Sequence, residues 1–145
     1  MKKILSLLII GLFTASFSLL AKEPQKQMSD DELSHRMLQT WMVHVVYSPV
    51  DVPNHFAGVE TFTSNGKFAL KGAFTVLKDK EPLEYEGTWN VKDGFLVETV
   101  TKSSRPAVIH VGAVTRDKIV RVDDRELVYQ TEQGKTVTRK RKPHA

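Results

Sequence analysis

The chain has 145 residues, with 21 basic and 17 acidic side chains, a formal net charge of +4 and no cysteine. A sequence without cysteine excludes disulfides, thiol catalysis and cysteine-based metal sites together. The length suits a single domain with one hydrophobic core.

The first 21 residues have the three-part pattern of a secretory signal peptide. Lys2 and Lys3 precede an apolar run over residues 4–20, and Ala21 is a small residue suited to the position before a cleavage site. The run is slightly shorter than the roughly 20 apolar residues of a membrane span, which favours cleavage over an uncleaved anchor. We therefore expect a periplasmic or secreted protein with no transmembrane segment after cleavage.

Cleavage after residue 21 would leave 124 residues, with 19 basic and 17 acidic side chains and a net charge of +2. Export and this small charge argue against a nucleic-acid partner. Residues 22–28 are polar and are predicted to be a flexible tether. Residues 29–142 form the predicted domain, and residues 143–145 form a short tail.

A short helix is predicted to open the domain. Ser29 is suited to cap it, and Glu32 stands three residues later, as in a capping box. The helix is expected to end near Gln39.

Alternating apolar residues and turn signals predict strands after the helix. Asn65-Gly66 and Asp93-Gly94 are strong hairpin signals. The expected strands are 41–47, 56–63, 67–77, 85–91, 95–101, 107–114, 118–122, 127–131 and 136–141, with a link near Arg116-Asp117 and polar turns or loops at 78–82 and 102–106. With no crossover helices between them, about eight strands in series favour an all-β, antiparallel up-and-down meander closed into a small barrel.

The order of these features resembles the lipocalin-like, calycin-type group of small bacterial secreted barrels. The resemblance covers residues 38–142. Its motifs are a strand beginning at Trp41, the hairpin through Asn65-Gly66, Glu86-Gly87-Thr88-Trp89-Asn90-Val91, Asp93-Gly94, Leu96-Val97-Glu98-Thr99-Val100, and the last hairpin with Lys118-Ile119-Val120-Arg121-Val122, Leu127-Val128-Tyr129 and Gly134-Lys135. The resemblance implies a lipocalin-like barrel that binds a small apolar molecule, and it implies no catalytic residue.

Aromatic side chains form the candidate ligand site, because apolar walls with few polar groups make a ligand pocket. The same side chains could instead fill a closed core, and strand-start tryptophans such as Trp41 and Trp89 usually close the floor of such a barrel. The candidate ligand-binding residues are Phe56, Glu60, Phe62, Phe68, Phe74, Tyr85 and Trp89. Glu60 alternates with Phe56 and Phe62, so it either points inward, toward a ligand head group or Arg121, or is turned out by a bulge.

Other chemistry has little support in the sequence. No histidine spacing typical of a metal site occurs, although His44 and His110 could meet in space. No serine elbow, phosphate loop or acid–base constellation requires an enzyme. We therefore predict a binding protein that is not an enzyme, with no catalytic residues, metal or cofactor.

The charged run Arg139-Lys140-Arg141-Lys142 has two interpretations. On a strand it is a solvated edge that resists pairing with other strands, or it touches anionic lipid headgroups. The alternative to a ligand carrier is an envelope protein-interaction module or inhibitor with a packed barrel, which would bind its partner through loops 48–55 and 102–106.

Overall fold

The computed structural model describes residues 28–47, 54–76 and 79–143. The predicted signal peptide, all but the last residue of the predicted tether and much of the predicted loop 48–55 lie outside the described residues. In the part of the chain that is described, no helix is both long enough and apolar enough to cross a membrane.

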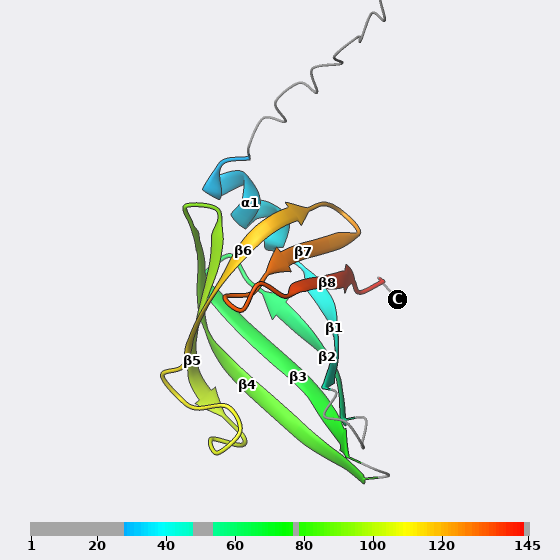
Figure 1. Ribbon diagram of the computed structural model, residues 1–145. Coiled ribbons are helices and arrows are strands. Elements are labelled where there is room, and N and C mark those ends of the chain that lie inside the picture. Colours follow the sequence, from blue (N-terminus) through cyan, green and yellow to red (C-terminus); the bar gives the residue numbers. More distant parts are fainter. Residues whose placement is uncertain (1–27, 48–53, 77–78, 144–145) are drawn as a thin grey trace, which may run out of the picture.

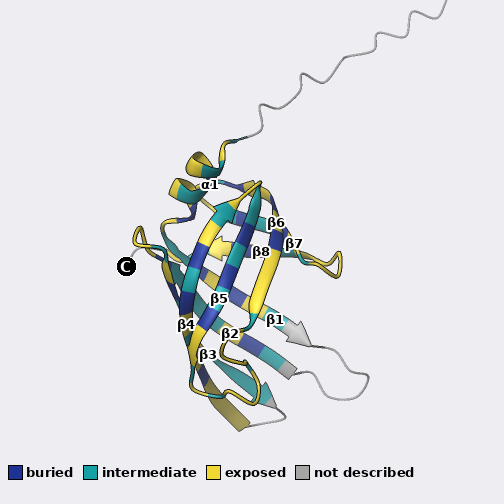
Figure 2. Ribbon diagram, turned by 90° about the vertical axis from the view of Figure 1, so that its left-hand side faces the viewer, coloured by how far each residue is buried: buried dark blue, intermediate teal, exposed yellow. Residues whose placement is uncertain are grey.

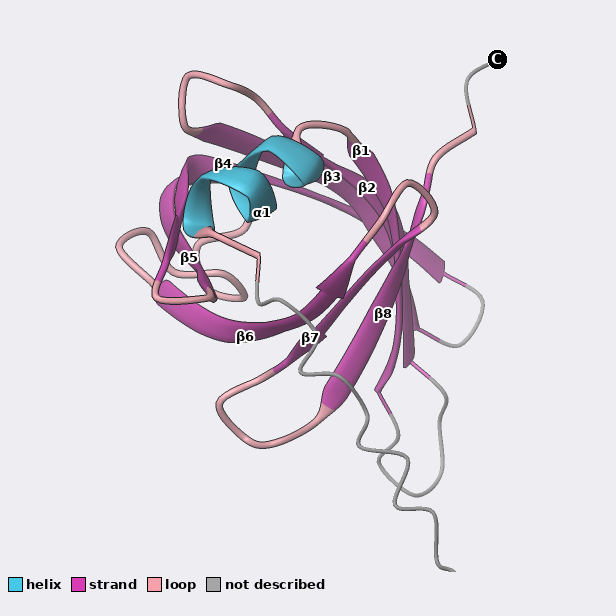
Figure 3. Ribbon diagram, turned by 90° about the horizontal axis from the view of Figure 1, so that it is seen from above, coloured by secondary structure: helices cyan, strands magenta, loops and turns pink. Residues whose placement is uncertain are grey.

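The predicted capped helix is present as α1 (Asp30–Met37). The hydroxyl of Ser29 accepts a hydrogen bond from the backbone N–H of Glu32 at 3.2 Å, which satisfies one of the free donors of the first turn. Leu33 and Met37 are the buried residues of the helix. Figure 3 shows α1 lying across one end of the barrel.

The other elements among the described residues are eight strands, and Figure 1 shows their order along the chain. They are β1 (Thr40–Tyr47), β2 (Asn54–Phe62), β3 (Lys67–Val76), β4 (Asp79–Lys92), β5 (Phe95–Ser103), β6 (Val114–Val122), β7 (Glu126–Gln130) and β8 (Thr136–Arg141). Each pairs antiparallel with its neighbours in sequence, and β8 pairs with β1, so the sheet is a closed barrel. The predicted all-β meander of eight strands with a short N-terminal helix is confirmed.

The hairpin signals form the expected tight turns. Gly66 has φ +72°, while Asp93 and Gly94 have φ +55° and +76°. Two successive residues with positive φ suit the right-handed twist of a β-hairpin. The helix is fastened to the second turn, because the carboxylate of Asp30 accepts the backbone N–H groups of Asp93 and Gly94 at 2.7 and 2.8 Å.

Burial alternates along the strands, as Figure 2 shows. On β5, for example, Leu96, Glu98 and Val100 are buried while their neighbours are more exposed. Side chains with the same parity face the same side of a sheet. The inward set of the barrel can therefore be read directly from burial.

One predicted strand is wrong. Residues 107–114 were expected to form a strand, but residues 104–113 are a loop of turns and β6 runs unbroken from Val114 to Val122. Ile109 donates its backbone N–H to the carbonyl of Arg105, and Gly112 has φ +88°. Arg116 and Asp117, where the sequence predicts a link between two strands, lie inside β6.

The polar turn predicted over residues 78–82 is also too long, since β4 already begins at Asp79. Pro82 lies within β4, opposite Ala73 of β3. The pairing of β4 with β5 begins only at Tyr85. The proline therefore stands where β4 has a partner on one side, which is the position that a strand tolerates.

The barrel closes unevenly. Strand β1 has eight paired residues with β2 but only two with β8, Trp41 with Arg141 and Met42 with Lys140. Strand β5 pairs with β6 only over residues 95–99. Figure 1 shows β2, β3 and β4 running on beyond β6, β7 and β8. The end under α1 is thus encircled by all eight strands, and we call the other end the open end.

Candidate functional site

The end under α1 is filled by an apolar core. Met37, Trp41, Leu96 and Leu127 are each 0% exposed. The indole N–H of Trp41 donates to the carbonyl oxygen of Met37 at 3.2 Å, which ties the first strand to the helix. This end has the composition and burial of a packed interior.

Three of the predicted ligand-binding residues belong to that closed core. Phe62, Phe68 and Trp89 are buried, and the rings of Phe62 and Trp89 meet edge to face with centroids 5.0 Å apart. The indole N–H of Trp89 donates to the carbonyl of Thr63 at 3.2 Å. At this end of the molecule the aromatic residues fill the barrel, as the alternative interpretation of them expects.

A second apolar cluster lies on the inner faces of β1 to β4, toward the open end. We call it the open-end cluster. Its buried members are Val43, Phe56, Leu70 and Leu83, and its partly exposed members are Val45, Phe74, Tyr85 and Ile109. The rings of Phe56 and Phe74 lie with their centroids 5.1 Å apart. The structure thus groups three predicted residues here, Phe56, Phe74 and Tyr85.

Tyr85 links the two clusters. It packs against both, and its ring meets Phe68 of the closed core edge to face at 6.0 Å. The seven predicted residues therefore do not form one site. Phe62, Phe68 and Trp89 lie in the filled end, and Phe56 and Phe74 lie toward the open end. Tyr85 and Glu60 lie between the two groups.

Glu60 points into the barrel, which is one of the two orientations that the sequence predicts for it. It is 1% exposed and lies on β2 between Phe62 of the closed core and Phe56 of the open-end cluster. Its partner is Arg139 of β8, whose guanidinium forms a buried ion pair with Oε2 of the carboxylate. The suggested partner Arg121 instead lies outside and pairs with Glu126.

Arg139 is 7% exposed, so the first residue of the charged run turns into the barrel and leaves Lys140, Arg141 and Lys142 as its outer part. Its guanidinium carbon lies 4.9 Å from the ring centroid of Tyr129. Burial lowers the pKa of Arg139 to about 9, and the side chain therefore stays protonated at neutral pH. Among the described residues, Oε1 of Glu60 and Nε of Arg139 have no hydrogen-bond partner.

Two further acids lie inside the barrel on the side of β5 and β6. Burial, reinforced by the negative charge of Asp117, raises the pKa of Glu98 from 4.5 to about 8. Burial, with a smaller contribution from Glu132, raises the pKa of Asp117 to about 6. At pH 7 Glu98 is thus mostly a neutral carboxylic acid, and the hydroxyl of Thr115 lies 3.4 Å from its Oε2.

The sequence predicts Arg139 in a basic surface run, and it gives no role to Glu98 or Asp117, whereas the structure buries all three inside the barrel. Strand alternation was the available signal, since Glu98 lies between Leu96 and Val100 on one face of β5. Arg139 was hidden within a run of four basic residues. Asp117 was taken for part of a turn.

The histidines are arranged differently from the expectation. His110 lies in the exposed loop between β5 and β6, not on a strand. His44 instead lies beside His55 of β2, with ring centroids 6.0 Å apart. Across the described ranges, no group of three or more histidine, aspartate or glutamate side chains is placed to hold a metal ion.

No protein-family model matches the chain, and no curated protein resembles it significantly in sequence. Its class is therefore defined by architecture alone, as a closed eight-stranded antiparallel up-and-down barrel capped by one helix.

Proposed function

We propose that this chain is an exported binding protein, not an enzyme, which holds a small and partly apolar ligand against the open-end cluster of a lipocalin-like, calycin-type barrel. The observation that carries the proposal is that the two ends of the barrel differ in packing and exposure. One end is capped by α1 and filled, whereas the other presents the partly exposed side chains of Val45 and Phe74. Tyr85 and Ile109 are also partly exposed and pack against both clusters.

A ligand that covers those side chains removes apolar surface from water, and this favours binding. Removing apolar surface from water contributes roughly 25 cal/mol per Å², so covering 200 Å² is worth about 5 kcal/mol before the cost of immobilising the ligand. The signal-peptide pattern of residues 1–21 supports a location in the periplasm or outside the cell.

The experiment has two parts. The chain is produced with its own leader, purified and extracted with organic solvent, and the extract is examined by mass spectrometry. The delipidated protein is then titrated with dodecanoate while it holds an environment-sensitive apolar dye. We expect an extractable lipid or similar molecule, saturable dye binding and its displacement by dodecanoate.

Phe74→Ala removes one wall of the open-end cluster, and Val120→Ala is its matched control, since Val120 is 61% exposed on β6. Losing part of a phenylalanine contact costs on the order of 1.4 kcal/mol, or tenfold in affinity. We expect Phe74→Ala to bind about tenfold more weakly and Val120→Ala to bind as the parent does. A parent with no extractable molecule and no dye response contradicts the carrier function.

A second function is favoured by a separate observation, an exposed apolar loop. Val108, Val111 and Val114 are 47%, 56% and 60% exposed in and beside the loop that joins β5 to β6. Such a group suits an envelope protein partner. Recovery of one specific protein from envelope extract, lost when Val108 and Val111 are both changed to serine, would support this function over ligand carriage.

A further inference from the structure

Two histidines lie side by side on the outer face of the barrel. On the paired strands β1 and β2, His44 is opposite Ala57 and Val46 is opposite His55, so the histidines are diagonal neighbours. Their rings are nearly parallel, at 6° to one another, with centroids 6.0 Å apart. His44 is exposed and His55 is half-buried.

One nitrogen of this pair lacks a partner. Nδ1 of His55 is enclosed by protein, and no described residue forms a hydrogen bond with it. A buried polar atom of this kind costs free energy unless a donor or a cation satisfies it. In the stacked arrangement Nδ1 is covered, and turning the His55 ring about its second torsion would bring a ring nitrogen toward an ion shared with His44.

The spacing of the rings fits a shared ion. A metal–nitrogen bond of about 2.0–2.1 Å places the ion roughly 3.2 Å from each ring centroid, so two imidazoles on one ion have centroids about 5 to 6.4 Å apart for bond angles from tetrahedral to linear. The 6.0 Å separation corresponds to a nitrogen–metal–nitrogen angle of about 140°. The trans arrangement of a tetragonal Cu²⁺ site therefore needs the centroids roughly 0.4 Å further apart. The broad second torsion of histidine allows the ring nitrogens to turn toward one another without a backbone shift.

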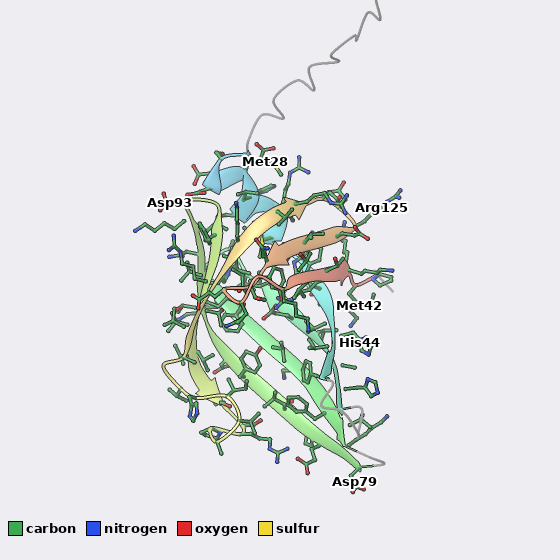
Figure 4. All side chains as sticks on the ribbon, viewed as in Figure 1. Met28, Met42, His44, Asp79, Asp93 and Arg125 are labelled. Carbon is green, nitrogen blue, oxygen red and sulfur yellow. The ribbon has the colours of Figure 1, made fainter. Side chains whose placement is uncertain are left out.

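The surroundings indicate which ions suit the pair. His44 and Met42 line a groove of about 720 Å³ on the outer face, whose other lining residues are Val43, Ala57, Gly58, Val59, Lys71, Thr138 and Lys140. Met42 is 39% exposed, and Figure 4 shows it beside His44 along the same flank of the molecule. His55 lies outside this lining, which contains the imidazole of His44 and the thioether of Met42 but no carboxylate. This donor set disfavours Mg²⁺ and Ca²⁺.

We propose that His44 and His55 form a bidentate surface site for a late first-row transition-metal ion, with Cu²⁺ bound ahead of Ni²⁺ and Zn²⁺. Among the divalent first-row metal ions, Cu²⁺ binds imidazole ligands most tightly. Water fills the remaining coordination positions. The ammonium groups of Lys71 and Lys140 in the same groove oppose the cation and keep the affinity below that of a site with three or more protein ligands.

The test uses the full chain, produced with its own leader and purified without an added histidine tag. Cu²⁺ is titrated into the parent and into His44→Gln, His55→Gln, His35→Gln, His110→Gln and His144→Gln, and binding is followed by calorimetry and by the nitrogen splitting of the copper electron paramagnetic resonance signal. Glutamine keeps the size and polarity of the side chain, and circular dichroism checks that each variant is folded.

We expect the parent to bind one Cu²⁺ tightly with a signal from two imidazole nitrogens. His44→Gln and His55→Gln should each weaken that binding at least tenfold and leave one imidazole nitrogen in the signal, while the other three variants should change it less than twofold. Equal binding by His44→Gln, His55→Gln and the parent would overturn the proposal. So would the absence of copper binding, or its loss in His110→Gln or His144→Gln alone.

Discussion

The buried pair of Glu60 and Arg139 gives the sharpest stability prediction. Arg139→Met keeps much of the side-chain volume but leaves the Glu60 carboxylate without its cation. Because Glu60 is 1% exposed and Arg139 is 7% exposed, water cannot replace the lost partner. Removing one partner of a buried ion pair typically costs 3–5 kcal/mol, so we expect a loss of about 4 kcal/mol in the free energy of unfolding.

The double variant Glu60→Gln with Arg139→Met removes both charges and should regain about 2 kcal/mol or more of that loss, since no uncompensated charge is left inside. The matched control is the outer pair of Arg121 and Glu126, whose side chains are 56% and 33% exposed. An exposed pair is worth about 0–1 kcal/mol, so Arg121→Met should have little effect.

Urea unfolding followed by tryptophan fluorescence measures these differences. With a slope on the order of 1.5–2 kcal/mol per molar, a loss of 4 kcal/mol lowers the unfolding midpoint by about 2 M or more. Glu60→Gln alone completes the cycle. A cost below about 1 kcal/mol for Arg139→Met, or a double variant whose loss equals the sum of the losses in Arg139→Met and Glu60→Gln, would refute the assignment of an energetically coupled buried pair.

Three other variants test other parts of the account. The pKa of Glu98 is raised from 4.5 to about 8, so between these pH values the folded chain binds a proton that the unfolded chain has lost. The free energy of unfolding should therefore fall by a few kcal/mol as the pH rises through that window. Glu98→Gln should remove most of this fall in urea unfolding measured from pH 5 to 8. Asp30→Ala loses two hydrogen bonds from the turn between β4 and β5 and should cost about 1–2 kcal/mol and speed hydrogen exchange in α1, whereas Asp31→Ala, also in the first turn, should not speed it. Gly87→Ala would place its Cβ 1.9 Å from the carbonyl oxygen of Thr99, so it should lower the melting temperature by at least 5 °C; a fully stable Gly87→Ala would contradict the close approach of β4 and β5 there.

Local signals predicted the local structure well. Ser29 and Glu32 gave the helix start, and Asn65-Gly66 and Asp93-Gly94 gave two hairpins, because such motifs act through hydrogen bonds and φ angles within a few residues. Alternation along β2 gave an inward Glu60 as one of two orientations, and Glu60 is 1% exposed inside the barrel.

The features that sequence reasoning missed depend on contacts between distant strands. Arg139 meets Glu60 only because β8 closes the barrel beside β1, and nothing near residue 139 records that closure. Residues 107–114 have the valines of a strand, yet Ile109 packs inward while Val108 and Val111 face solvent in a loop. The division of the aromatic residues between two ends follows from the unequal lengths of strand pairing, which periodicity does not encode.

The central claim is that a ligand occupies the open-end cluster and leaves the closed core untouched. Methyl-labelled protein titrated with dodecanoate and followed by nuclear magnetic resonance tests it residue by residue. We predict saturable shifts at Val43, Val45, Leu70, Leu83 and Ile109, with the signals of Leu96, Ile119, Val122 and Leu127 unchanged. Shifts confined to the second group or to the exposed valines, or no shift at any concentration, would contradict the account.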